Sequence, residues 1–73
     1  MNVEALNLSI RKFLKVVGVN SQREIEQAVE RALQSRVIEG TENLPVRMTL
    51  EMPGLKLSVH FDGQIHLEEK PPE

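Results

Sequence analysis

The sequence of 73 residues predicts an α+β domain in two layers, with an N-terminal helical hairpin packed on a three-stranded antiparallel β-meander (ααβββ, strand order 1-2-3). Two observations lead to this prediction. Apolar residues recur at intervals of three and four up to about residue 35, and they alternate with polar residues from residue 46 onward. The four glycines and four prolines all lie between these periodic segments. A small sheet needs a covered face, which the apolar sides of two helices would provide.

Two helices are expected, over residues 3–17 and 21–35. In the first, the apolar residues fill one stripe about 100° wide, Asn2 caps the start, and Gly18 ends the helix in the left-handed conformation. The second starts with the capping-box sequence Ser21–Glu24. The expected core residues are Val3, Leu6, Ile10, Phe13, Leu14 and Val17 in the first helix and Ile25, Ala28, Val29, Ala32 and Leu33 in the second.

Three strands are expected, over residues 46–52, 55–61 and 64–69. In the first two strands every second residue is apolar, which is typical of a strand with one buried face. The tail 70–73 is expected to fray, and residues 1–73 are expected to form a single domain because the chain is too short for two.

The turns between these strands are predicted from the register. Pro53-Gly54 is a turn pair, and a two-residue loop there would set Met52 opposite Leu55. A two-residue loop at Asp62-Gly63 would mix the apolar and polar faces. We therefore predict a three-residue bulged loop of residues 61–63, in which Gly63 is left-handed.

Composition excludes several classes of protein. The chain has no cysteine, so it has no disulfide, thiolate metal site or cysteine nucleophile, and a reducing cytoplasm is the expected location. It has neither an apolar run of roughly 20 residues nor a signal-peptide pattern, so no membrane association is expected. The net charge of −2 and the presence of only two aromatic residues disfavour a dedicated nucleic-acid binder.

Catalytic machinery is not evident in the sequence. No histidine has an acidic partner at a spacing typical of a catalytic triad, and the glycines are isolated rather than gathered in a phosphate loop. A core this small leaves no pocket of the usual size. We therefore predict that the protein is not an enzyme, with no catalytic residue, no cofactor and no small-molecule substrate.

His60 and His66 are expected on adjacent strands, where they could be a pair of metal ligands. A usable site needs three or four ligands, and neither Glu51 nor Glu68 is well placed to be the third. No metal site is therefore predicted, and the polar face of the sheet is expected to be solvated, with Glu51 across from Lys56.

Three apolar residues of the first helix lie outside the expected core: Leu8, and nearer to the core stripe Ala5 and Val16. Leu8 points about 180° away from the apolar stripe. Together with Arg11, Lys12 and Lys15 it is a possible partner-contact patch. The unpaired outer edge of the first strand offers a second route to association. These features favour a non-catalytic protein-interaction module, or a homodimer, as the leading function.

The alternative is weak nucleic-acid binding through a segment like a helix-turn-helix, residues 10–33, with Arg23 as the possible contact. Its turn would be Gly18-Val19-Asn20-Ser21. Nucleic acid is nevertheless an unlikely partner, because the helix that would read the bases also carries three glutamates that repel phosphates. These are Glu24, Glu26 and Glu30.

The stretch Leu6–Leu14, continued by Val17-Gly18-Val19 and Ser21–Glu26, resembles a small family of short bacterial proteins known only as a domain of unknown function. The resemblance spans most of the chain and is strongest over residues 5–33. It implies a bacterial, cytoplasmic, stand-alone domain. The family carries no established activity or site residues, so the resemblance assigns a role to no residue of this chain.

Overall fold

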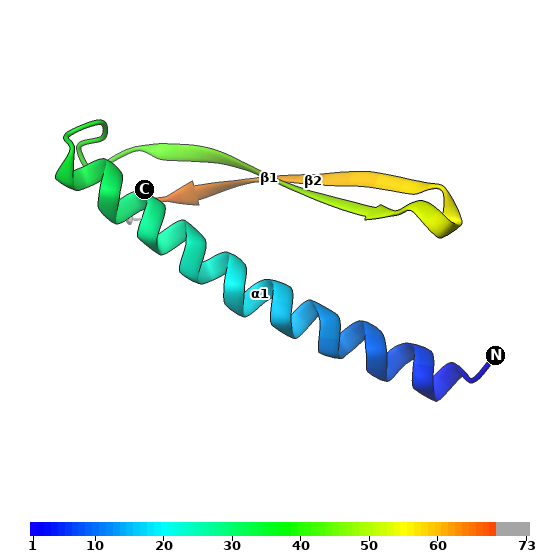
Figure 1. The fold of residues 1–73 in the computed structure, drawn as a ribbon. Helices are drawn as coiled ribbons and strands as arrows, with labels where there is room; N and C mark the ends of the chain where they lie inside the picture. Colours follow the sequence, from blue (N-terminus) through cyan, green and yellow to red (C-terminus); the bar gives the residue numbers. More distant parts are fainter. Residues whose placement is uncertain (69–73) are drawn as a thin grey trace, which may run out of the picture. The chain divides into compact units, whose positions relative to one another are not determined.

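The computed structural model describes residues 1–68, which contain one long helix followed by a β-hairpin (Figure 1). The chain divides into two compact units, residues 1–37 and a second unit that begins at Ile38. The elements in chain order are the helix α1 (Val3–Gln34), the strand β1 (Asn43–Met52), the 3₁₀ turn η1 (Pro53–Leu55) and the strand β2 (Leu57–His66). The α+β composition and the antiparallel sheet agree with the sequence prediction.

Both ends of α1 are capped. The prediction for its start is confirmed, because the Asn2 side chain accepts a hydrogen bond from the Ala5 N–H at 3.1 Å. At its other end Arg36 takes the left-handed conformation (φ 60°) that glycine usually supplies. The N–H of Arg36 donates to the Leu33 carbonyl and that of Val37 to the Ala32 carbonyl, which is the Schellman arrangement.

The predicted helical hairpin is wrong, because α1 runs without interruption through residues 18–21. One glycine costs a helix interior only about 1 kcal/mol relative to alanine. Val17, Ser21 and Ile25 follow one another at intervals of four, so the two predicted stripes join into one band on a continuous helix. The Asn20 side chain bonds back to the Val16 carbonyl at 2.9 Å rather than opening a turn. The sequence therefore contains an end-cap signal at Gly18 and a start-cap signal at Ser21, but no helix ends or begins at either residue.

The predicted three-stranded meander is also wrong, because the sheet of the described residues has two strands. Residues 57–66, which the prediction divides between the second strand, the bulged loop and the third strand, form the single strand β2. Asp62 and Gly63, the predicted bulged loop, pair with Arg47 and Val46 of β1 inside the ladder. Gly63 is not left-handed, since the positive-φ glycine in the described chain is Gly40. The predicted fraying of residues 70–73, and the last residue of the predicted third strand, lie outside the described residues.

The turn between the strands is longer than the two residues predicted at Pro53-Gly54. Residues 53–56 make it, with Lys56 left-handed (φ 54°) and its N–H bonded to the Pro53 carbonyl. Met52 consequently pairs with Leu57 instead of Leu55. The ladder then extends without a bulge to the pair Asn43–His66, so β1 starts three residues before the predicted residue 46.

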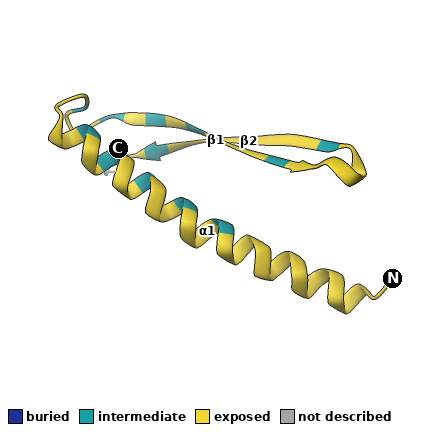
Figure 2. Cartoon of the chain, viewed as in Figure 1, coloured by how far each residue is buried: buried dark blue, intermediate teal, exposed yellow. Residues whose placement is uncertain are grey.

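The hairpin has one apolar and one polar face, because directly paired residues of antiparallel strands point to the same side. Figure 2 shows that no residue of the described chain is buried. The predicted three-stranded sheet is thus replaced by a two-stranded ribbon. A two-stranded hairpin alone is marginally stable in water.

Candidate interaction surface

The apolar face of the ribbon is the most extensive feature of the second unit. Every second pair of the ladder, five pairs of ten, places only apolar side chains and one glycine on this face. Phe61 is 62% exposed, and Met48 opposite it is 41% exposed. An apolar face of this regularity, none of whose residues is buried, is a candidate contact site. The ten positions are Leu44, Val46, Met48, Leu50 and Met52 on β1 and Leu57, Val59, Phe61, Gly63 and Ile65 on β2.

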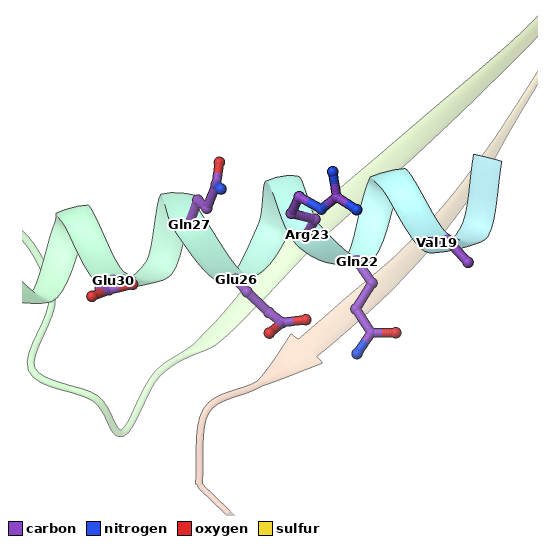
Figure 3. A pocket seen from close by; sticks show the side chains of 6 residues that line it. All are labelled: Val19, Gln22, Arg23, Glu26, Gln27 and Glu30. Carbon is purple, nitrogen blue, oxygen red and sulfur yellow. The ribbon is translucent and has the colours of Figure 1, made fainter. Parts of the chain in front are cut away.

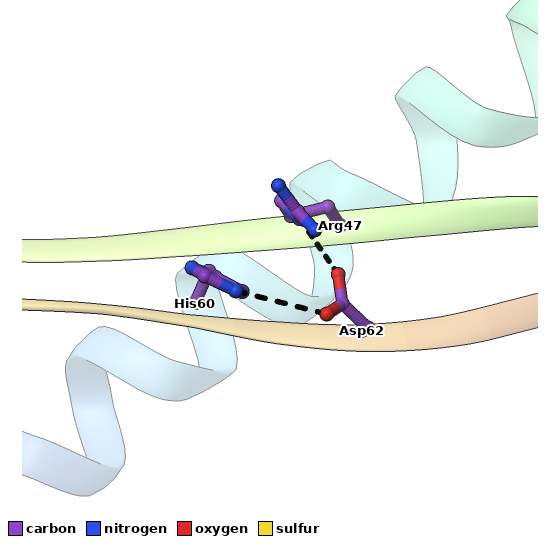
Figure 4. Close-up of polar contacts among 3 residues, drawn as sticks. All are labelled: Arg47, His60 and Asp62. Carbon is purple, nitrogen blue, oxygen red and sulfur yellow. Dashed lines mark hydrogen bonds and ion pairs between the residues drawn. The ribbon is translucent and has the colours of Figure 1, made fainter.

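The polar face carries one cluster of opposite charges. The Arg47 Nε donates to Asp62 Oδ1 across the ladder at 2.7 Å, and His60 Nε2 lies 3.7 Å from the other carboxylate oxygen (Figure 4). All three side chains are more than half exposed. An exposed ion pair of this kind contributes at most about 1 kcal/mol to stability. The cluster therefore orients the charged side chains of the polar face but contributes little to the stability of the ribbon.

The two edges of the ribbon differ in their suitability for further pairing. β1 contains Pro45, which has no N–H to donate to a neighbouring strand. β2 contains no proline and no lysine, and its ten residues pair with β1 without a bulge. Proline, lysine and bulges are the features that usually protect an exposed edge, and β2 has none of them. Within residues 1–68 no strand pairs with the outer edge of β2, which is therefore the better candidate for pairing with another strand.

The four residues predicted as a contact patch share one side of α1. Leu8, Arg11, Lys12 and Lys15 are spaced three and four apart, and all are exposed. Leu8 is 61% exposed, but Phe13 and Leu14 of the apolar stripe are exposed to a similar degree. The first unit thus has two candidate surfaces, and the use of either by a partner stays a prediction.

Arg23, the predicted nucleic-acid contact, lies on a shallow pocket along α1. Figure 3 shows Arg23 and Gln27 pointing to one side of the helix, and Gln22 and Glu26 to the other. The carboxylates of Glu26 and Glu30 belong to the same lining. Because α1 is continuous here, the predicted turn of a helix-turn-helix is absent. The local charge also opposes phosphate.

The two histidines cannot share a metal ion, because they do not lie on adjacent strands as the sequence predicts. Both lie on β2, six residues apart, which is about 20 Å along a strand. His60 pairs with Thr49, and the His66 Nδ1 lies 2.6 Å from the Asn43 side-chain oxygen. Among residues 1–68 no cluster of three or more metal-binding side chains occurs.

The loop before β1 is organised by a single carboxylate. The N–H groups of Glu39, Gly40 and Thr41 donate to the Glu42 carboxylate at 2.8, 2.9 and 3.0 Å. These bonds, first those from Glu39 and Gly40, hold the pKa of Glu42 below its usual value. The loop thus binds its own anion and leaves these three donors satisfied.

Sequence reasoning missed the β2 edge and the cluster of Arg47, His60 and Asp62. One signal could have found them: apolar residues and one glycine occupy every second position from Leu57 to Leu67, without a break at Asp62-Gly63. Strict alternation over that length is typical of one strand. The turn tendency of Asp62-Gly63 led to the prediction of a loop there instead of a continuous strand.

The fold and surface define a small protein of one helix and one hairpin, in which no described residue is buried. The chain belongs to the family of unknown function DUF6494, whose family model matches residues 1–68. Comparison with curated proteins and with solved structures found no match. Among the described residues, no helix combines the length and the apolar character needed to cross a membrane.

Proposed function

We propose that the protein is a non-catalytic module that acts through protein–protein contact, first of all by associating with a second copy of itself. The observation that carries this proposal is the apolar face of the ribbon, which has ten positions and no buried residue. A hairpin of two strands gains independent stability only when further strands or a helix are added to it. Association supplies such a cover and is common among small domains.

The first unit supports the same proposal. A helix of 32 residues is about 48 Å long, and most of the stability of a protein helix comes from packing of its apolar face. On α1 no residue of that face is buried, and in its first half Leu6 is 44% and Ile10 45% exposed. Each unit therefore brings an apolar surface whose burial would stabilise it.

The bacterial and cytoplasmic assignments belong to this proposal. The cytoplasmic location rests on the absence of cysteine. The nucleic-acid alternative has lost the helix-turn-helix geometry on which it was based, and no observed feature of α1 replaces it. We therefore do not carry it forward as a second function.

The experiment is a mass measurement by light scattering over a dilution series of the full chain. Met48→Asp places a charge in the apolar face, whereas Thr49→Asp places the same charge on the polar face of the same strand. We expect an oligomer that dissociates on dilution, persists at high salt because apolar contacts are not screened, and is lost in the first variant only. A monomer at all concentrations would contradict self-association, and equal effects of the two variants would contradict the use of the apolar face.

A pair of variants on α1 tests whether that helix contributes. Ile10→Asp charges the apolar stripe, and Leu8→Asp charges the opposite side, where Leu8, Arg11, Lys12 and Lys15 lie. Loss of association in Ile10→Asp alone assigns the contact to the stripe. Loss in Leu8→Asp alone assigns it to the predicted patch.

A further inference from the structure

We propose that two copies of the chain join edge to edge through β2, antiparallel and around a two-fold axis at Phe61. This inference rests on the proposed function and deepens it, because it names the partner as a second copy and the contact as one strand. The result would be a four-stranded sheet in the order β1-β2-β2-β1. Its apolar face, which carries Met48, would be twice as wide as that of one ribbon and would be the surface on which a further copy packs, and only the better protected β1 edges would remain free.

The choice of β2 follows from the difference between the two edges. Pro45 interrupts the donors of β1. β2 has no such residue from Leu57 to His66, and the middle of the strand carries Phe61, the most exposed of the apolar residues within either strand. A long exposed edge without these devices is the kind that recruits another strand.

Symmetry restricts how β2 can pair with itself. Around a two-fold axis one residue must lie opposite its own copy, and every other residue then pairs with one on the same face. The apolar face of the ribbon therefore stays on one side of the joined sheet in any such register. The centre of β2 lies between Phe61 and Asp62, so an axis at either of these two residues gives the longest overlap.

Charge decides between these two registers. An axis at Asp62 would set two carboxylates directly opposite each other, and like charges in that position are destabilising. An axis at Phe61 sets each Asp62 opposite His60 of the second copy instead. Asp62 would then lie between Arg47 of its own chain, already bonded at 2.7 Å, and an imidazole of the other copy. The same register pairs the two Phe61 rings, and aromatic cross-strand pairs are favourable.

The register also matches the sizes of the apolar side chains. It sets Val59 opposite Gly63 of the second copy, as Val46 already lies opposite Gly63 within the chain. Gly63 would then have a valine on each side. Leu57 would pair with Ile65 of the second copy, so all apolar positions of β2 meet apolar positions or glycine.

Cysteine crosslinking tests this register directly, because the natural chain contains no cysteine. Directly opposite residues have Cα atoms about 4.5–5.5 Å apart, within the range that a disulfide spans. Four variants of the full chain would each be oxidised mildly and separated without reductant: Phe61→Cys, Asp62→Cys, His60→Cys and Met48→Cys. We expect the crosslinked dimer as the main product for Phe61→Cys alone. A mixture of the His60→Cys and Asp62→Cys chains should also crosslink, although neither does so by itself.

Each other outcome overturns the register or the proposed function, and the two can be told apart. A crosslink from Asp62→Cys or His60→Cys alone shifts the axis, and one from Met48→Cys moves the contact to β1; either overturns this inference while self-association stands. The mixed pair does not alter Phe61, so it reports the register even where Phe61→Cys fails to fold. If the unmodified chain associates by light scattering but no variant or mixture crosslinks, the inference is wrong. If it is monomeric throughout, both proposals fail.

Discussion

Val46 lies directly across the ribbon from Gly63, and a Cβ built on Gly63 would sit 3.6 Å from Val46 Cγ1. That distance is an ordinary van der Waals contact, and Gly63 has no positive φ that would exclude a side chain. Glycine inside a strand weakens the strand through its larger entropy loss. We therefore expect Gly63→Ala to raise the free energy of unfolding by about 0.4–1 kcal/mol.

Urea unfolding at one fixed protein concentration measures this change, since association makes stability depend on concentration. The same variant separates the observed ladder from the bulged loop predicted from the sequence. In that loop Gly63 would be left-handed, and alanine there would be destabilising. A loss of stability in Gly63→Ala would therefore speak against the continuous strand β2.

Periodicity in the sequence identified the right regions but not the number of elements. The helical repeat up to residue 35, the Asn2 cap and the alternation after residue 46 all correspond to observed structure. The errors lie at Gly18 and at Asp62-Gly63, where a local turn or cap signal was taken as the end of an element. Each such signal changes the free energy of folding by only about 1 kcal/mol. Extending a helix or strand whose apolar face stays aligned contributes more than that.

The candidate surface could be predicted only in part, for a related reason. Leu8 and the basic residues near it share a side of α1 because helical spacing alone determines that. The Arg47–Asp62 pair depends on the register, and the register changed when the turn extended to Lys56. A shift of the turn by two residues replaces every cross-strand partner, so no pair predicted from the shorter turn was retained.

Gly18 gives a second test of element boundaries. In the continuous α1 a Cβ at this position would meet no atom within 4 Å apart from its chain neighbours and the adjacent turns of the helix backbone, and helix interiors favour alanine over glycine by about 1 kcal/mol. We expect Gly18→Ala to raise the free energy of unfolding by about that amount and to increase helical circular dichroism. In a helical hairpin Gly18 would be a left-handed end cap, so alanine would lower both quantities.

Arg36 occupies a left-handed position after α1 that glycine fits without steric cost. We expect Arg36→Gly to stabilise the chain by about 1 kcal/mol, because the left-handed conformation costs a non-glycine residue roughly 1–2 kcal/mol. Arg31→Gly is the matched control: it makes the same change inside α1, where it should destabilise by a similar amount. If thermal unfolding showed that both variants stabilise the chain, or that both destabilise it, the Schellman end of the helix would be contradicted.

Glu42 makes the stability of the hairpin unit depend on pH. Three backbone N–H groups hold its pKa below the ordinary value of 4.5 in the folded chain. The stability that the carboxylate contributes is therefore fully present above pH 4.5 and is lost as the pH falls through the lowered pKa of the folded state. Glu42→Gln removes this charge and should flatten the dependence of stability on pH below the ordinary pKa of 4.5.

The control is Glu39→Gln, because among the described residues no backbone N–H donates to the Glu39 side chain, although it lies in the same loop. Urea midpoints of the natural chain and the two variants, compared at pH 7 and near pH 3, isolate the effect of Glu42. The Glu39 variant should keep the acid sensitivity of the natural chain, and the Glu42 variant should be less stable at pH 7 but lose less on acidification. An acid response that is the same in all three chains would mean that the three loop hydrogen bonds do not stabilise the ionised carboxylate in solution.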